Sequence, residues 1–154
     1  MRRPVLDAAR LRRATTDDAA DVAEVYLISR RAAAPYIPRV RHTDDDVREW
    51  VASIVLVERE VWVAVIDDRI VAIAVLRDDF VDLFYVLPGH QRRGVGTRLL
   101  AQCKRQRRVL RLYTFQSNEP ARDFYEKHGF RAVAFGDGTG NEEGEPDVLY
   151  EWRG

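Results

Sequence analysis

The stretch YVLPGHQRRGVGT, residues 85–97, decides the fold of this chain. It predicts a buried strand that ends at the Pro-Gly pair and passes through a glycine-rich turn into a helix beginning near Val95. Gly94 and Gly96 let backbone amides approach a ligand closely, and the first helical turn leaves its N–H groups without intrahelical partners. The amides of residues 92–97 therefore predict a pyrophosphate cradle, to which two adjacent arginines add charge. The alternative is that these glycines only make a tight turn.

Two well-known glycine-rich phosphate motifs do not fit this stretch. A Walker loop ends in Gly-Lys-Ser/Thr, and no such triplet is present. The dinucleotide fingerprint needs a third glycine at the position that Leu99 occupies. The turn therefore indicates a phosphate site of another kind.

Hydrophobic patterning on both sides of the turn predicts a mixed α/β (α+β) sheet with helices on its faces, in the order βααβββαβαββ. The expected strands are residues 10–14, 61–66, 70–76, 80–87, 109–115, 130–135 and 147–152. A helix over 95–106 makes the connection between strands 80–87 and 109–115 long enough for a parallel, right-handed crossover. Asn118 is expected to cap a further short helix that ends before Gly129.

Two more helices are expected ahead of the first hairpin, giving about four helices and six to seven strands. The first follows a cap at Thr16, and its inner stripe is Val22, Val25, Ile28 and Ala32. The second begins at Thr43 and buries Val47, Trp50, Val51, Ile54 and Val55. Both prolines of segment 35–39 lack the N–H that a helix needs, so this segment is expected to be a shaped loop between the helices.

Composition bounds the class of protein. The chain has 154 residues, 46% hydrophobic and 32% charged, which predicts one folded domain over residues 1–154. Lys+Arg 25 balances Asp+Glu 25, so no overall charge attracts nucleic acid or a membrane surface. A lone Cys103 excludes an intrachain disulfide, and charged residues from Asp7 onward interrupt any apolar export segment. These features predict a cytoplasmic protein, and its richness in arginine and alanine suggests a bacterial source.

Other possible sites carry little signal. His42, His90 and His128 show no ligand spacing, so no metal site is expected, and His90 is expected on the surface. The basic run at residues 104–108 has no interleaved aromatic residues and reads as the solvated end of a helix, so no nucleic-acid partner is expected. Cys103 shares the inward stripe of that helix and is expected to be inert.

Two segments resemble the GNAT superfamily of N-acetyltransferases. Gln91-x-x-Gly94-x-Gly96 is similar to its acyl-CoA motif Q/R-x-x-G-x-G/A, and NEPARDFYEKHGF, residues 118–130, is similar to its N-x-x-A-x-x-x-Y-E-K-x-G-F segment. The predicted order of elements agrees with the family along nearly the whole chain. One departure is that the family often has arginine where this chain has Gln91.

The resemblance implies a GNAT-like three-layer fold with a partly splayed sheet and acetyl-CoA as cosubstrate. Strands 80–87 and 109–115 would diverge and admit the pantetheine arm, and a backbone amide near Val86 would polarise the thioester carbonyl. For Asn118 the alternative role is a plain helix cap, which is compatible with cofactor contact. The residues that the resemblance places on the cofactor are Tyr85, Val86, Gln91, Arg92, Arg93, Gly94, Val95, Gly96, Thr97, Asn118 and Arg122.

Two residues are expected to take part in the acetyl transfer, Tyr125 and Asp82. The resemblance places Tyr125 beside the departing CoA thiolate; proton transfer from a free phenol to this thiolate is uphill by about 2 kcal/mol, so it accompanies C–S cleavage or is hydrogen bonding only. The alternative for Tyr125 is a core aromatic. Alternation places Asp82 on the face of Phe84, opposite Leu83. We expect it to be a base or an anchor for the acceptor, and otherwise a structural carboxylate paired with arginine.

The acceptor is expected to be a primary amine of a small molecule or peptide, attacking directly in a ternary complex. Arginines 39 and 41 favour an anionic acceptor, whereas glutamates 142, 143 and 145 favour a cationic one, so its identity stays open. An inactive CoA-binding regulatory module is the alternative function, and a homodimer is possible. The residues expected to bind the acceptor are Tyr36, Arg39, His42, Thr114 and Gln116.

Overall fold

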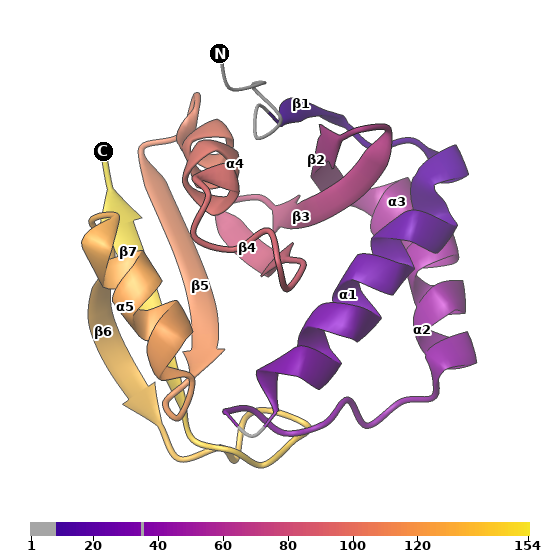
Figure 1. Cartoon of the computed structure of the whole chain (residues 1–154). Helices are drawn as coiled ribbons and strands as arrows, with labels where there is room; N and C mark the ends of the chain where they lie inside the picture. The colour runs from indigo at the N-terminus through magenta and orange to yellow at the C-terminus, as the bar shows by residue number, and fades with distance from the viewer. Residues whose placement is uncertain (1–8, 35) are drawn as a thin grey trace.

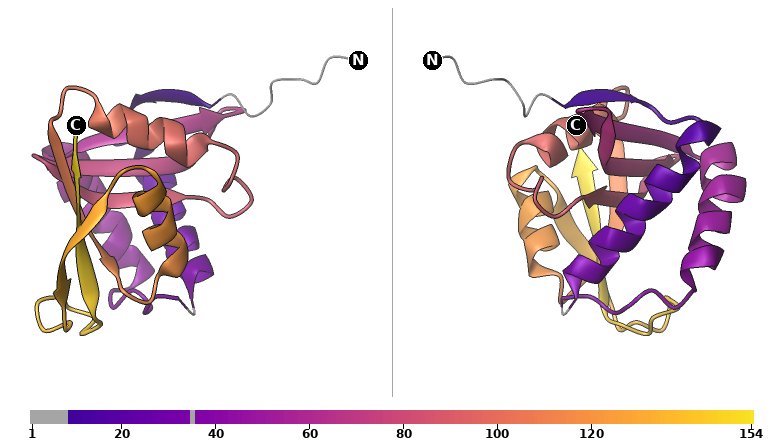
Figure 2. Two further views of the ribbon diagram at one scale, coloured as in Figure 1. Left: turned by 90° about the vertical axis from the view of Figure 1, so that its left-hand side faces the viewer. Right: turned by 45° about the vertical axis from the view of Figure 1, so that its right-hand side comes forward.

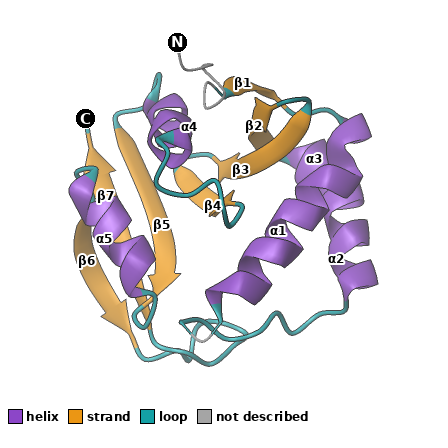
Figure 3. Cartoon of the chain, viewed as in Figure 1, coloured by secondary structure: helices purple, strands orange, loops and turns teal. Residues whose placement is uncertain are grey.

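The computed structural model describes residues 9–34 and 36–154, which form a seven-stranded sheet in the order β1-β2-β3-β4-β5-β7-β6 with helices on both faces (Figures 1 and 3). The strands are β1 (Arg10–Arg13), β2 (Glu60–Ile66), β3 (Arg69–Arg77), β4 (Phe80–Val86), β5 (Val109–Phe115), β6 (Arg131–Gly136) and β7 (Asp147–Arg153). The helices are α1 (Ala19–Ala33), α2 (Asp44–Trp50), α3 (Leu56–Glu58), α4 (Val95–Lys104) and α5 (Glu119–Lys127). The predicted order of strands and helices is confirmed, with α2 and α3 joined through a π-helical stretch, Val51–Val55.

Two sequence-based expectations fall on residues that the structure does not describe. The start of the chain, residues 1–8, was considered for an export signal, and Pro35 belongs to the expected loop between the first two helices. Among the residues that are described, no helix combines the length and the apolar character needed to cross a bilayer.

The sheet is continuous except between β4 and β5. β1 to β4 form an antiparallel meander, and β5, β7 and β6 form a second antiparallel unit. The two units are joined by parallel pairing at Phe80 and Arg111 alone, and the Arg111 N–H donates to Asp79 O at 2.8 Å beside it. Beyond this point β4 and β5, which are both fully described, have no positions paired with each other. This confirms the parallel crossover and the expected divergence of the two strands.

Helices cover the two faces of the meander (Figure 2). Tyr26 of α1 packs edge-to-face on Tyr85 with ring centroids 5.4 Å apart. A Cβ added to Gly96 at the start of α4 would lie 3.5 Å from a methyl group of Val86 on the opposite face. Since Tyr85 and Val86 are neighbours on β4, α1 and α4 flank the same part of the strand from opposite sides.

Parts of the predicted helical stripes were wrong. Ile28 and Ala32 of α1 are exposed, whereas Arg30 is buried. In the second helical segment, Trp50 and Ile54 are 39% and 36% exposed, while valines 47, 51 and 55 are buried as expected. The reason is that α1 lies between the sheet, α2 and the chain after it, so its buried face includes a residue whose charge would normally exclude it.

The entry into α1 differs by one residue from the prediction of a cap at Thr16. Thr15 is the N-cap of a short 3-10 turn, Thr16–Asp18, and its N–H donates to the Asp18 carboxylate at 2.8 Å. The Arg12 guanidinium donates to both oxygens of this carboxylate, at 2.8 and 3.0 Å. The hydrogen bond from Arg12 is the main reason that the pKa of Asp18 lies below its usual range.

We expect Asp18→Asn to lower the free energy of unfolding at pH 7 by about 1–2 kcal/mol. Because folding lowers the pKa of Asp18, its stabilisation is present above the unfolded pKa near 3.9 and is lost as the pH falls through the folded value. Urea unfolding at pH 7 and at about pH 3 measures this, with Asp17→Asn in the same turn as control. A deficit of equal size at both pH values would contradict the prediction.

Candidate functional site

Backbone groups of β4 point into the gap between the two halves of the sheet. The Leu87 N–H donates to Val71 O of β3 at 2.8 Å, so by alternation the N–H and C=O groups of Val86 and Phe84 are directed away from β3. On β5, the Arg111 N–H already faces β4, which places the backbone groups of residues 113 and 115 on the same side. An extended amide-containing chain could pair with both edges.

The glycine-rich turn has the geometry of an anion cradle. Gly94 is the N-cap of α4 with φ +83°, and Arg92 has φ +64°, so the backbone reverses sharply before the helix begins. The N–H groups of the first turn of α4 have no intrahelical partner and point out of the helix start. Gln91 holds this turn against β4, because its side-chain amide donates to Val86 O at 3.1 Å. Gln91 was expected to contact the cofactor directly, but its side-chain amide is already bonded to the protein backbone.

Close packing explains the second glycine of the motif. A Cβ at Gly96 would lie 3.3 Å from the Phe124 ring, so even a methyl group crowds the contact between α4 and α5. Val95 is buried beside it. Thr97 Oγ1 lies 3.2 Å from His128 Nε2, which adds a residue at the end of α5 that the sequence analysis had not associated with the turn. Burial and two nearby lysines lower the pKa of His128.

Tyr125 lies in an aromatic cluster below the gap. Its ring centroid is 6.2 Å from that of Phe84 on β4, and 5.5 Å from that of Phe130. Burial raises the pKa of Tyr125 well above its usual value. Among the residues that the structure describes, its hydroxyl has no hydrogen-bond partner. The hydroxyl therefore has a donor that the described part of the fold does not use.

The other two residues of segment 118–130 that were expected at the cofactor have structural partners. Asn118 caps the helix, since its Oδ1 accepts a hydrogen bond from Ala121 N at 3.3 Å. Arg122 donates to the Tyr150 hydroxyl at 3.0 Å and to Gln116 O at 3.2 Å. The cap is confirmed for Asn118, whereas Arg122 ties α5 to β7 and to the end of β5.

The predicted face of Asp82 was wrong. The register shifts between Leu76, which pairs with Val81, and Val75, which pairs with Leu83, so Asp82 is the extra residue of a β-bulge. A bulge interrupts alternation, and Asp82 shares a hollow of about 450 Å³ with Leu83. The walls of this hollow are Trp50, Val55, Arg59, Val75, Arg77, Asp82 and Leu83.

Two arginines engage the Asp82 carboxylate. Arg77 donates to both oxygens, at 3.2 and 3.3 Å, and Arg59 Nε lies 3.5 Å from Oδ2. These contacts favour a structural carboxylate paired with arginine over a base, which would need free lone pairs.

The five residues expected to bind the acceptor have different surroundings in the structure. Gln116 donates to Gly136 O at 3.0 Å and to Asp147 O at 2.8 Å, so its amide group holds the ends of β6 and β7. Thr114 is half-buried on β5, while Tyr36 and Arg39 are exposed. His42 Nε2 lies 3.1 Å from both carboxylate oxygens of Glu142.

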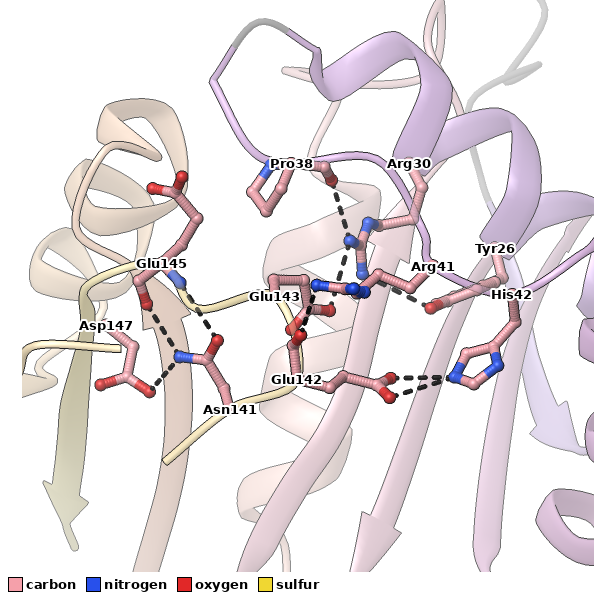
Figure 4. A network of polar contacts seen from close by, with 10 residues as sticks. All are labelled: Tyr26, Arg30, Pro38, Arg41, His42, Asn141, Glu142, Glu143, Glu145 and Asp147. Atoms are coloured by element: carbon pink, nitrogen blue, oxygen red, sulfur yellow. Dashed lines mark hydrogen bonds and ion pairs between the residues drawn. The ribbon is translucent and has the colours of Figure 1, made fainter. Parts of the chain in front are cut away.

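A polar network joins the chain after α1 to the loop between β6 and β7 (Figure 4). Arg41 donates to Glu142 O at 3.0 Å, beside the contact of His42 with the same residue. At its centre, Arg30 donates to Pro38 O at 3.0 Å and to the Tyr26 hydroxyl at 3.4 Å. The burial of Arg30 was not predictable from the helical pattern, because an arginine between apolar positions normally faces solvent.

Burial and neighbouring oxygens shift the pKa values of Arg30 and Tyr26 and leave the first charged and the second neutral at pH 7. Burial works against the charged form of Arg30, but the oxygens of Tyr85, Tyr26 and Glu143 outweigh it, so its pKa is raised. Burial raises the pKa of Tyr26 to about 12. Arg30 is therefore a permanent cation on the α1 side of the gap.

Comparison with known proteins places this geometry in a family. Residues 58–132 match the acetyltransferase (GNAT) domain, and this segment contains β2 to β5, the glycine-rich turn and α5. This part of the chain is matched as a GNAT acetyltransferase domain, as the two sequence motifs had indicated. Over 124 residues it is 26% identical to the peptidyl-lysine N-acetyltransferase YiaC of Escherichia coli, covering 80% of this chain and 84% of that protein.

Solved structures share the fold. The apo form of YjaB from Escherichia coli superposes with a TM-score of 0.77 at 21% identity, over 94% of this chain and 97% of YjaB. YncA of Salmonella typhimurium, solved with acetyl-CoA, gives 0.70 at 20% identity over 94% and 93% of the two chains. The PaiA N-acetyltransferase of Thermoplasma acidophilum, in complex with coenzyme A, gives 0.72 at 17% identity over 96% and 99%.

Proposed function

We propose that the chain transfers an acetyl group from acetyl-CoA to a primary amine by direct attack in a ternary complex. The observation that carries this proposal is the combination of a gap with unpaired backbone groups and a glycine-rich helix start at one end of it. Pantetheine carries two amides that can pair with the edges of β4 and β5, while the diphosphate accepts hydrogen bonds from the amides of residues 92–97. The Arg92 and Arg93 side chains add positive charge there.

Polarisation of the thioester depends on the exposed edge of β4. The N–H groups of Val86 and Phe84 face the gap, and a donor fixed there stabilises the oxyanion that forms when the amine attacks. On the other side, Tyr125 donates to the departing thiolate. The same burial that raises its pKa also desolvates the thiolate, which makes the thiolate a stronger proton acceptor.

A covalent route through cysteine fits poorly. Cys103 is fully buried on the inner face of α4, and burial raises the pKa of its thiol to about 12. Attack by a thiol requires the thiolate, which is scarce under these conditions. Direct attack by the amine on the bound thioester needs no such group.

The amine must lose its proton before it attacks. For a lysine-like amine this costs about 4–5 kcal/mol at pH 7, so kcat/KM is expected to rise with pH toward the pKa of the amine. Asp82 remains a proposed base, but its ion pairs with Arg59 and Arg77 favour the structural role. Proton loss to water then accounts for the chemistry.

Asp82→Asn is therefore expected to reduce kcat by less than about tenfold and to leave the pH profile unchanged. It should lower the free energy of unfolding by about 0.5–1 kcal/mol, less at high salt, because two arginines lose their common partner. Steady-state kinetics from pH 6 to 9 and urea unfolding check both parts. A larger loss of kcat with a displaced pH profile would instead assign the base to Asp82.

The test of the proposed function is release of CoA from acetyl-CoA over a panel of amines, including peptides that contain lysine. The named relative supports a lysine acceptor, and the same assay compares it with small amines. Calorimetry with CoA measures cofactor binding separately. Binding without turnover of any amine would favour the inactive regulatory module.

A further inference from the structure

The buried guanidinium of Arg30 has an incomplete set of partners. Arg30 is 7% exposed, and its hydrogen bonds go to the neutral oxygens of Pro38 and Tyr26 and to the side chain of Tyr85, a phenol that is also neutral. Its anionic neighbour Glu143 is 3.8 Å away, longer than a hydrogen-bonded ion pair. The Arg30 Nε is buried and has no hydrogen-bond partner. A buried cation with an unused donor and a distant counter-ion can bind an anion more closely than it binds Glu143.

Arg30 lies where an acceptor must approach. Its guanidinium is 5.8 Å from the Tyr26 ring and 6.0 Å from the ring of Phe115 at the end of β5. Tyr26 in turn packs on Tyr85 of β4. Arg30 therefore spans the two strands that diverge, on the face opposite α4, whose first turn is the proposed diphosphate site.

Glu143 lies in a loop, where no helical or strand hydrogen-bond ladder holds the backbone. The loop runs between β6 and β7 and contains three glycines, of which Gly144, the neighbour of Glu143, has φ +68° and open space where a Cβ would stand. Glu142 anchors the loop separately through Arg41 and His42. The contact of Glu143 with Arg30 is thus separate from the contacts that hold Glu142 (Figure 4).

We propose that Arg30 binds a carboxylate carried by the acceptor amine, and that Glu143 occupies this place when no acceptor is bound. This inference rests on the proposed acetyl transfer. A guanidinium binds a carboxylate with two parallel hydrogen bonds, which would use donors that Glu143 leaves unused. A second cation beside Arg30 would be repelled, so the acceptor's ammonium group is directed away from this end and toward the thioester.

The surrounding charges support an anionic ligand. Arg41 donates to a backbone carbonyl, a contact that does not neutralise its charge. The Glu142 carboxylate contacts His42 instead. Of the glutamates in this loop, Glu142 contacts His42 and Glu143 faces Arg30, which favours an anionic ligand near Arg41. The carboxylate has two possible sources, the acceptor's own terminal carboxylate or an acidic residue next to a lysine in a peptide.

Two matched pairs of acceptors test the proposal and separate these sources. The first pair is Nα-acetyl-lysine and its carboxamide; the second is a capped peptide containing Asp-Lys and the same peptide containing Asn-Lys. We expect the wild type to favour the carboxylate member of one pair by about tenfold in kcat/KM, through KM. The pair that shows the preference identifies the source.

Three variants complete the test. Arg30→Gln should abolish the preference while binding acetyl-CoA normally, whereas Arg31→Gln, an exposed neighbour paired with Asp44, should retain it. Glu143→Gln should lower KM for the carboxylate acceptor by about threefold or more, since the competing anion is gone. This variant also keeps the test decisive if Arg30→Gln does not fold.

The outcomes separate the role of Arg30 from acetyl transfer itself. Equal use of both members in each pair by the wild type, a preference that survives Arg30→Gln, or an unchanged KM in Glu143→Gln would overturn the role of Arg30 and leave acetyl transfer standing. No turnover of any of the four amines would overturn the proposed function for lysine acceptors, and this inference with it.

Discussion

Tyr125→Phe is expected to lower kcat for amine acetylation by about 10²- to 10³-fold, with the affinity for acetyl-CoA changed by less than about threefold. The hydroxyl has no hydrogen-bond partner among the described residues and lies in an aromatic cluster with Phe84 and Phe130, so the ring should stay in place when the oxygen is removed. What is lost is the donor to the departing thiolate. Steady-state kinetics and calorimetry with CoA measure the two effects.

A second measurement separates this role from a structural one. A thioester whose leaving thiol is more acidic than CoA needs less help on departure, so it should restore much of the activity of Tyr125→Phe. Tyr150→Phe is the matched control, because its hydroxyl accepts a bond from Arg122 and donates to Glu126. That variant should lose stability and show no such rescue. Equal kcat in Tyr125→Phe and the wild type would exclude the role of Tyr125 as a donor.

Gly96→Val is expected to weaken binding of acetyl-CoA by about 100-fold or more. Even a Cβ at this position would lie 3.3 Å from the Phe124 ring and 3.5 Å from a methyl group of Val86, and valine adds two further carbons. The side chain would push the first turn of α4 away from β4 and α5, so the amides of residues 92–97 and the edge of β4 would no longer be aligned for one ligand. Titration with CoA gives the affinity.

Gly140→Val is the control for this prediction. Gly140 lies in the loop between β6 and β7, where an added Cβ would meet nothing within 4 Å, and its φ is not in the left-handed region. This variant should bind CoA like the wild type. Thermal unfolding of both variants shows how much of the effect on Gly96→Val comes from lost stability. Normal CoA affinity in folded Gly96→Val would contradict the proposed placement of the cofactor.

Local chemistry made much of the fold predictable. Thr43 accepts the hydrogen bond from Asp46 N that a cap requires, Asn118 caps α5, and Gly129 has φ +89° after that helix. These signals depend on residues within one turn of each other, so no knowledge of the tertiary structure is needed to read them. The crossover between β4 and β5 followed from the length of the connection.

Predictions that depended on packing were less reliable. Alternation along β4 assumes a regular strand, and the bulge at Asp82 broke that assumption. Helical periodicity predicted that Ile28 is buried and gave no indication that Arg30 is. The reason is that periodicity follows apolar residues and does not show which neighbours enclose the helix. The side chains of Gln91 and Gln116 have backbone carbonyls as partners, which residue type alone does not reveal.

The sequence by itself determined the family, the order of the elements and the position of the glycine-rich turn, because each is written in residues close together along the chain. Only the tertiary structure decided which charges meet on the acceptor side. Arg30 and Glu143 are far apart in the sequence, and their contact depends on how α1 and the loop between β6 and β7 pack around the gap. A hydrogen-bonded ion pair forms only between groups that packing brings to within about 3 Å, so composition does not determine which charges pair.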